Sequence, residues 1–171
     1  MKVNFDGAVF DNSKATGVGC IGRDASGKCV AWLQQRFLFG TSPAAAETLA
    51  ALEALRMARR RGWRKIELEG DCLGLISQLR ANTRDLSMLG PLLNDIFDLV
   101  PFFDSVVFKC VRRLGNVPAH LLARSATVEL EGDNILPPQV LSAVLSDYQY
   151  KHWSPRYNEL NPCASRLHLD L

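Results

Sequence analysis

The sequence predicts an α/β fold in which a five-stranded mixed sheet carries helices on both faces. Two patterns predict it: three consecutive strand-like segments with short connections, and then an alternation of helix-like and strand-like segments. The composition agrees, because 171 residues with 47% hydrophobic and 22% charged content are typical of one globular domain with an extension. The first three strands are expected to be antiparallel, and those separated by helices parallel.

The N-terminal third supplies the antiparallel part of the sheet. Residues 2–10 alternate in hydrophobicity, 16–23 form a light, Gly-rich strand, and 29–37 form a third strand after the turn "DASGK" at 24–28. The short connections predict a meander of three adjacent strands.

A long helix is predicted to follow, up to about Arg61. Ser42 is the expected N-cap, Pro43 suits the first helical position, and Gly62 ends the helix. Beyond it, the pattern predicts a strand at 65–71, a helix at 72–82, a helix at 90–100, a strand at 105–113 and a last helix at 117–130.

The C-terminal part differs in composition from the rest. We expect a main domain at 1–130, a proline linker with an amphipathic helix at 131–150, and a poorly ordered tail at 151–171. The helix is indicated by apolar residues at 140, 141, 144, 145 and 148, whereas the tail shows no period.

Composition also limits which cellular compartments and which kinds of binding partner are expected. No run approaches the roughly 18 apolar residues of a membrane span, and the N-terminus has no secretory pattern. The five cysteines are odd in number and widely spaced, with no CxxC pair, so a reducing compartment fits best. We expect an intracellular monomer, in nucleus or cytoplasm, that does not bind membranes.

One stretch is strongly basic although the net charge is only +2. Six cations and no acid fall between positions 56 and 65. They either complement the negative, C-terminal end of the predicted helix on which most of them lie, or form part of a surface that contacts phosphates.

Three carboxylates are candidate site residues. Asp6 in "NFDGAV" could belong to a hairpin, but the turn signal at 11–14 follows too soon, so a position within the strand is favoured. Glu47 shares a helix face with the alanines at 50, 51, 54 and 58, which suits close packing on a sheet, whereas Glu53 lies on a face that looks solvated. Asp71 ends a strand, where it could cap the next helix, take part in a site, or do both.

These carboxylates can converge only if their strands are neighbours. Clustered carboxylates repel one another unless they share a cation. Oxygen ligands without a Cys or His pair suit Mg²⁺ or Mn²⁺, which indicates phosphate chemistry by two-metal catalysis.

At this point the sequence resembles a type 1 ribonuclease H domain, in the subgroup carried by plant non-LTR retroelements. The resemblance rests on "VNFDGA", "GVGCIGRDASGKCVAW", "AAAETLAALEALRMARRRGWRKIELEGD", "SMLGPLLNDI" and "VVFKCVRRLGNVPAHLLARSA", in order over residues 2–127. It implies a ribonuclease H-like fold and Mg²⁺-dependent endonucleolytic cleavage of the RNA strand in RNA–DNA hybrids, leaving a 5′-phosphate and a 3′-hydroxyl.

The resemblance also assigns the site. Asp6, Glu47 and Asp71 match three of the four carboxylates of the family, with Asp6 bridging both metals. The fourth position, in the family's "N-x-x-A-D-x-L-A" helix, is here His120 in "NVPAHLLA". His120 either ligates the second metal, favouring Mn²⁺ over Mg²⁺, or is a helix histidine without a role.

Several departures from the family pattern concern residues expected to bind the substrate. Ala45 and Ala46 precede the helix glutamate where amides are expected, Cys72 and Leu73 follow Asp71, "VRRLGN" lacks the family's histidine, and a basic handle is missing. The alternative function is therefore a catalytically weak or silent nucleic-acid-binding module derived from a retroelement. A third hypothesis, that the chain is a domain that binds a small ligand, is the weakest, because no Gly-rich phosphate-binding loop follows the first strand.

Overall fold

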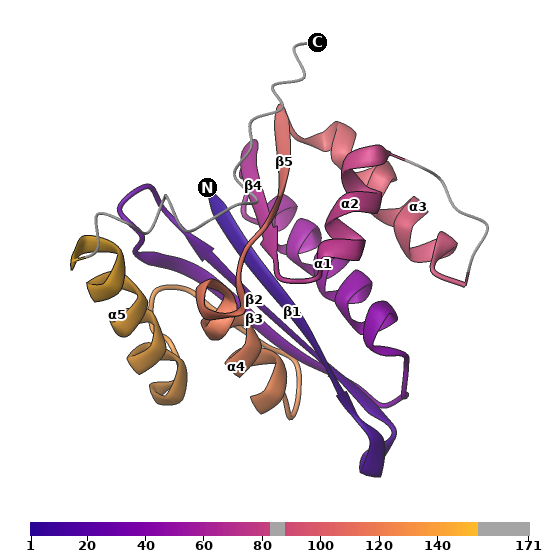
Figure 1. Ribbon diagram of the computed structural model, residues 1–171, viewed down its shortest axis with the longest axis horizontal. Coiled ribbons are helices and arrows are strands. Elements are labelled where there is room, and N and C mark those ends of the chain that lie inside the picture. Colours follow the sequence, from indigo (N-terminus) through magenta and orange to yellow (C-terminus); the bar gives the residue numbers. More distant parts are fainter. Residues whose placement is uncertain (83–87, 154–171) are drawn as a thin grey trace.

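The computed structural model describes residues 1–82 and 88–153, which form a mixed sheet with helices on both faces (Figure 1). The sheet has six strands in the order β5-β4-β1-β2-β3-β6. The prediction of five strands was wrong by one, because residues 130–132 form a short edge strand.

The strands are β1 Lys2–Phe10, β2 Ala15–Arg23, β3 Cys29–Phe37, β4 Lys65–Gly70, β5 Ser105–Cys110 and β6 Leu130–Gly132. The helices are α1 Pro43–Arg60, α2 Leu73–Ala81, α3 Gly90–Leu99, α4 Val117–Ser125 and α5 Pro138–Trp153. Two predicted ends were too late: β5 stops at Cys110 rather than 113, and α4 stops at Ser125 rather than 130.

The predicted strand directions are confirmed. β1, β2 and β3 pair antiparallel, and β4 pairs parallel with both β1 and β5. β1 pairs with β2 along its whole length but with β4 only over residues 2–4. Since β4 ends at Gly70, no strand in the described part of the chain pairs with the second half of β1 on that side, and the site lies at this gap.

Helix α1 begins and ends as its sequence predicts. Ser42 Oγ accepts a hydrogen bond from the Ala45 amide (3.2 Å), and Pro43 is the first helical residue. The chain then turns away at Gly62, whose φ of 69° lies in the left-handed region that glycine adopts at little cost.

The small-residue face of α1 packs on the sheet as expected. The four alanines that share the face of Glu47 are fully buried. The expectation for Glu53 was wrong: it is 6% exposed, and its carboxylate accepts a hydrogen bond from Arg56 at 2.7 Å. An ion pair one turn along the helix therefore allows Glu53 to be buried.

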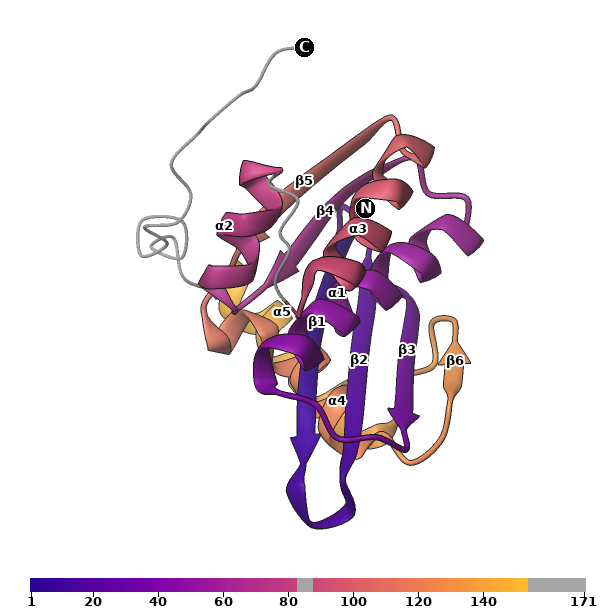
Figure 2. The same ribbon diagram turned by 90° about the vertical axis from the view of Figure 1, so that its right-hand side faces the viewer.

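The sheet separates two apolar cores, with α1, α2 and α3 on one face and α4 and α5 on the other (Figure 1). In the second core, Val140 and Val144 of α5 pack with Trp32 and Leu122. Figure 2 shows how short β6 is beside β3 at the sheet edge. It pairs with residues 32–34, and the Trp32 indole donates to the backbone oxygen of Ile135 (2.8 Å).

The C-terminal predictions fall partly outside the described residues. The helix indicated by the apolar spacing is present as α5, and it reaches Trp153. The poorly ordered tail was predicted to begin at 151, but residues 151–153 belong to α5, and the remainder, from 154 onward, lies outside the described residues. None of the described helices combines the length and the apolar character that a membrane crossing needs.

Candidate active site

The candidate active site lies where β4 leaves the sheet beside β1. Asn4 of β1 is in register with Glu69 of β4, so Asp6 lies just past the last residues of β4. Asp71 follows directly on that strand. The register of two parallel strands therefore brings Asp6, within β1, and Asp71, just past the end of β4, to the same height, because β1 and β4 are neighbours.

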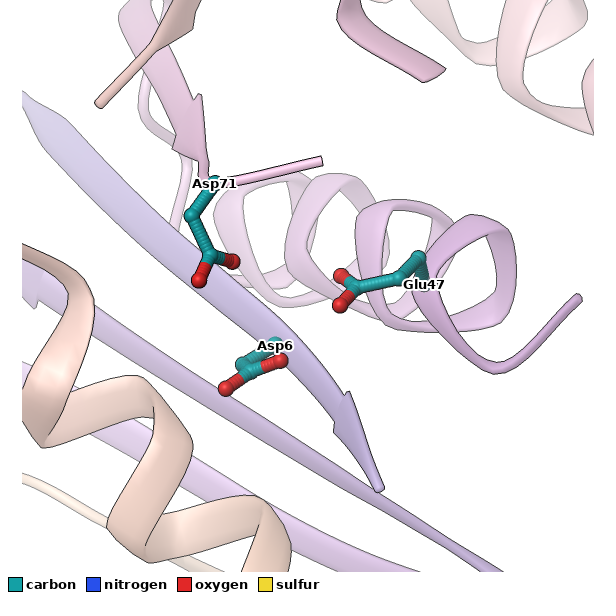
Figure 3. A group of neighbouring side chains, drawn as sticks. All are labelled: Asp6, Glu47 and Asp71. Carbon is teal, nitrogen blue, oxygen red and sulfur yellow. The ribbon is translucent and has the colours of Figure 1, made fainter. Parts of the chain in front are cut away.

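Glu47 reaches the same place from α1. It follows Ala46, whose backbone packs on Gly7 of β1: a Cβ atom on Gly7 would lie 2.6 Å from the Glu47 nitrogen. This close approach needs a residue without a side chain. Figure 3 shows the carboxylates of Asp6, Glu47 and Asp71 pointing toward one another. One oxygen of each lies within 4.8 Å of the others.

His120 adjoins this group through Asp6. Its Nδ1 lies 2.7 Å from Asp6 Oδ2, and its side chain is 30% exposed. It is not one of the residues whose ligand atoms share the 4.8 Å group. α4 can approach β1 and β2 so closely because Gly19, in register with Asp6, leaves room for it.

Two polar residues of the site were missed by sequence reasoning. Asn116 precedes α4 and is of a residue type that favours helix N-caps, but its side chain makes no cap hydrogen bond. Instead it is fully buried, and its Nδ2 donates to the Phe5 carbonyl oxygen (2.8 Å) and to Asp71 Oδ1 (3.1 Å). Asn116 therefore holds Asp71 against β1.

Arg113 is the second missed residue. Its Nη1 donates to Asp71 Oδ2 (2.8 Å) and lies 3.6 Å from Asp6 Oδ2, and its Nη2 lies 2.8 Å from His120 Nδ1. The segment "VRRLGN" was interpreted only by the histidine that it lacks. Its two arginines, which precede the helix of His120, were the signal that could have predicted a cation at the site.

Burial dominates the electrostatics of the carboxylates. It raises the pKa of Asp6, whose side chain is 0% exposed, above its ordinary value, and the charge of Asp71 adds to the rise. Burial also raises the pKa of Glu47 to about 9, with the charge of Asp6 as the next cause. A pKa of about 9 favours the protonated form of Glu47 at neutral pH when no metal ion is bound.

The donor set fits a divalent metal ion. Asp6 Oδ1 and Glu47 Oε2 are buried and have no hydrogen-bond partner among the described residues. Buried carboxylate oxygens without partners are costly, and a shared cation would remove that cost. Three carboxylates without a cysteine suit Mg²⁺ or Mn²⁺.

The basic cluster at 56–65 is largely neutralised by acids from elsewhere in the chain. Arg60 and Arg61 both pair with Glu131 of β6, and Arg61 also pairs with Asp133. Arg56 pairs with Glu53 and Asp95, Arg64 pairs with Asp104, and Arg59 lies 3.7 Å above the Phe102 ring. These arginines tie α1 to β6 and to the segment before β5, which weakens the interpretation of a phosphate-contacting surface.

Comparison with known proteins identifies the family. The pattern of the family described as "Reverse transcriptase-like" matches residues 4–126, which is most of the chain. The chain belongs to this family. No curated protein matches it.

Solved structures show the same fold. Ribonuclease H1 from the halophilic archaeon Halobacterium salinarum is 28% identical, with a TM-score of 0.68 over 73% of this chain and 95% of that one. The N-terminal ribonuclease H domain of a Mycobacterium tuberculosis protein is 22% identical, with a TM-score of 0.65 over 74% of this chain and 98% of that one. LC11 ribonuclease H1, isolated from compost by a metagenomic approach and solved with an RNA/DNA hybrid, is 20% identical, with a TM-score of 0.64 over 73% and 94%. This reverse transcriptase-like chain therefore has a ribonuclease H-like fold.

Proposed function

We propose that this protein is a divalent-metal-dependent endonuclease that cleaves the RNA strand of RNA–DNA hybrids. The observation that carries the proposal is the convergence of Asp6, Glu47 and Asp71 at the end of β4. The structural relatives support it, because they are ribonucleases H and one of them was solved with a hybrid.

Each carboxylate has a distinct place in the proposed reaction. Asp6, at the centre, would contact both ions, while Glu47 and Asp71 would each hold one. Bound Mg²⁺ or Mn²⁺ would activate water and stabilise charge on the phosphate. Asn116 keeps the Asp71 carboxylate directed at Asp6, and His120 faces Asp6 from α4.

His120 distinguishes this site from one with four carboxylates. Imidazole brings no negative charge, and its nitrogen suits Mn²⁺ better than Mg²⁺. We therefore expect weak cleavage in Mg²⁺ and a marked gain in Mn²⁺.

The experiment is a cleavage assay on a hybrid with a labelled RNA strand, run in Mg²⁺ and in Mn²⁺. His120→Asp should raise the rate in Mg²⁺, and Asp6→Asn should abolish cleavage in both metals. Asp104→Asn is the matched control, because it makes the same chemical change outside the carboxylate group. Asp104 is exposed, directly precedes β5 and pairs with Arg64. It should cleave like the unmodified protein.

A catalytically silent module that binds nucleic acid is the second candidate, in keeping with the resemblance to retroelement-derived domains. Two observations favour it: Arg113 is hydrogen-bonded to Asp71, and two large apolar side chains that lie close to site residues in sequence, Leu73 and Leu114, are 57% and 80% exposed. If the protein and His120→Asp both leave the hybrid intact in every metal yet bind it, this function replaces the enzyme.

A further inference from the structure

The guanidinium of Arg113 contacts the carboxylate group on the side of Asp71 and His120. Nη1 lies 2.8 Å from Asp71 Oδ2 and 3.6 Å from Asp6 Oδ2, so one nitrogen faces two carboxylates. Nη2 lies 2.8 Å from the imidazole Nδ1 of His120. A single cation therefore contacts three of the four residues proposed to form the metal site.

The oxygens that Arg113 contacts differ from those left without partners. Arg113 faces Oδ2 of Asp6 and Oδ2 of Asp71. The buried oxygens without hydrogen-bond partners are Oδ1 of Asp6 and Oε2 of Glu47. Among the described residues, Arg113 thus places a positive charge beside one set of these oxygens, and the oxygens without partners have none beside them.

We propose that Arg113 is a tethered cation that occupies the place of a second divalent ion, so that the free protein binds one ion tightly and a second only when Arg113 moves away. The first ion would be held on the side of Glu47, and Arg113 would compete with the second on the side of Asp71. This inference rests on the proposed function, because it assumes that Asp6 holds a metal ion.

Arg113 can act in this way because more than half of its side chain is exposed to solvent. It begins the short 3₁₀ segment Arg113–Asn116, and its side chain is 56% exposed. Asp6 and Asp71, in contrast, have side chains that are 0% and 10% exposed. The arginine is thus a long, solvent-accessible side chain on a buried anionic site, and arginine stays charged at every working pH.

Charge explains why the competition should be strong. Two cations beside the same carboxylates repel each other, and this repulsion is larger in a partly buried site than in water. Removing Arg113 leaves Asp6 and Asp71 with an uncompensated charge on that side, which raises their affinity for a divalent ion. We therefore expect the second ion to bind about tenfold or more tightly after Arg113→Ala.

The test is calorimetric titration with Mn²⁺ at constant pH, without nucleic acid, so that it does not depend on activity. The unmodified protein should bind one ion well and a second weakly or not at all, whereas Arg113→Ala should bind two. Arg113→Lys keeps the charge and should stay closer to the unmodified protein. Arg112→Ala is the matched control, because Arg112 is an exposed neighbour for which no ion pair is seen among the described residues; it should change neither ion.

The outcomes separate this inference from the proposed function. If Asp6→Asn loses the first ion while Arg113→Ala leaves the second unchanged, the metal site stands and the role of Arg113 is wrong. If no variant binds Mn²⁺, or Asp6→Asn binds like the unmodified protein, both are wrong. Thermal unfolding of each variant verifies folding, and Arg113→Gln, which keeps hydrogen-bond donors without the charge, replaces Arg113→Ala should the latter not fold.

Discussion

Gly7 of β1 lies directly against the backbone of Ala46 in α1. A Cβ atom on Gly7 would lie 2.6 Å from the Glu47 nitrogen and closer still to the Ala46 carbonyl group. The contact sets the distance between β1 and α1 at the point where Asp6 and Glu47 face each other. It is therefore both a packing contact and a determinant of the site.

We predict that Gly7→Ala displaces α1 and lowers the free energy of unfolding by about 1–3 kcal/mol. The variant should also bind Mn²⁺ more weakly, because Glu47 moves away from Asp6. Gly74→Ala is the control, since nothing lies within 4 Å of a Cβ at this helical position, and alanine there should be neutral or stabilising. Urea unfolding of both variants is the measurement, and equal stabilities would contradict the proposed role of Gly7.

The raised pKa of Glu47 makes the stability of the metal-free protein depend on pH. Because the folded-state pKa of about 9 lies above the ordinary value of 4.5, the protonated group contributes stability that is complete below about pH 4.5. That contribution declines progressively as the pH rises from 4.5 and is lost once the pH passes about 9.

We predict that Glu47→Gln removes this loss, because the amide stays neutral at every pH. At pH 8 in a chelator, the variant should be more stable by about 1–3 kcal/mol. Added Mn²⁺ should reverse the order by stabilising the unmodified protein more. Urea unfolding between pH 6 and 9 is the measurement, and parallel pH profiles for the two proteins would contradict the prediction.

Asn116 is predicted to be indispensable as a hydrogen-bond donor. Asn116→Asp has nearly the same shape but replaces the amide that donates to Phe5 and Asp71 with an acceptor. We expect a loss of about 2–4 kcal/mol at pH 7, since a buried carboxylate would then face Asp71. Burial and repulsion would raise the pKa of the new carboxylate in the folded state, so the deficit should shrink as the pH falls and it is protonated. Urea unfolding at pH 5 and pH 7 tests this, and a deficit that does not change with pH would count against it.

The attachment of α5 can be tested with two adjacent residues. Val140 is fully buried against the α4 side of the sheet, whereas Leu141 is 44% exposed. Val140→Ala should cost about 1–2 kcal/mol of unfolding free energy, and Leu141→Ala less than about 0.5 kcal/mol. Chemical denaturation distinguishes them, and equal effects would contradict the attachment of α5 through Val140.

Most of the fold could be predicted because its elements carry local signals. The alternation in β1, the capping of α1 by Ser42 and the alanine face beside Glu47 are properties of a few adjacent residues. The strand directions followed from the short connections and the intervening helices. The convergence of Asp6, Glu47 and Asp71 was predicted on condition that their strands were neighbours, as β1 and β4 are. The roles of these three carboxylates in metal binding and catalysis are part of the proposed function.

The misses depend on contacts between distant residues. β6 is only three residues long, and it is held by pairing with β3 and by Arg60 and Arg61, which lie 70 residues away in sequence. Asn116 has a residue type that favours helix caps, but Phe5 and Asp71 compete successfully for its amide. Glu53 is a different case, because its partner Arg56 lies only three residues away and their ion pair permits its burial. Local propensity does not contain these interactions.

The short strand β6 also has a consequence for self-association. β3 is nine residues long and rich in apolar side chains, and an edge of this kind readily recruits a strand from another molecule. β6 covers residues 32–34 of that edge and places Glu131, paired with two arginines of α1, beside it. A chain that ended before β6 would expose the backbone groups of β3 in full. We therefore expect removal of residues from 130 onward to favour aggregation through strand addition, so the extension beyond α4 keeps the sheet from growing between molecules.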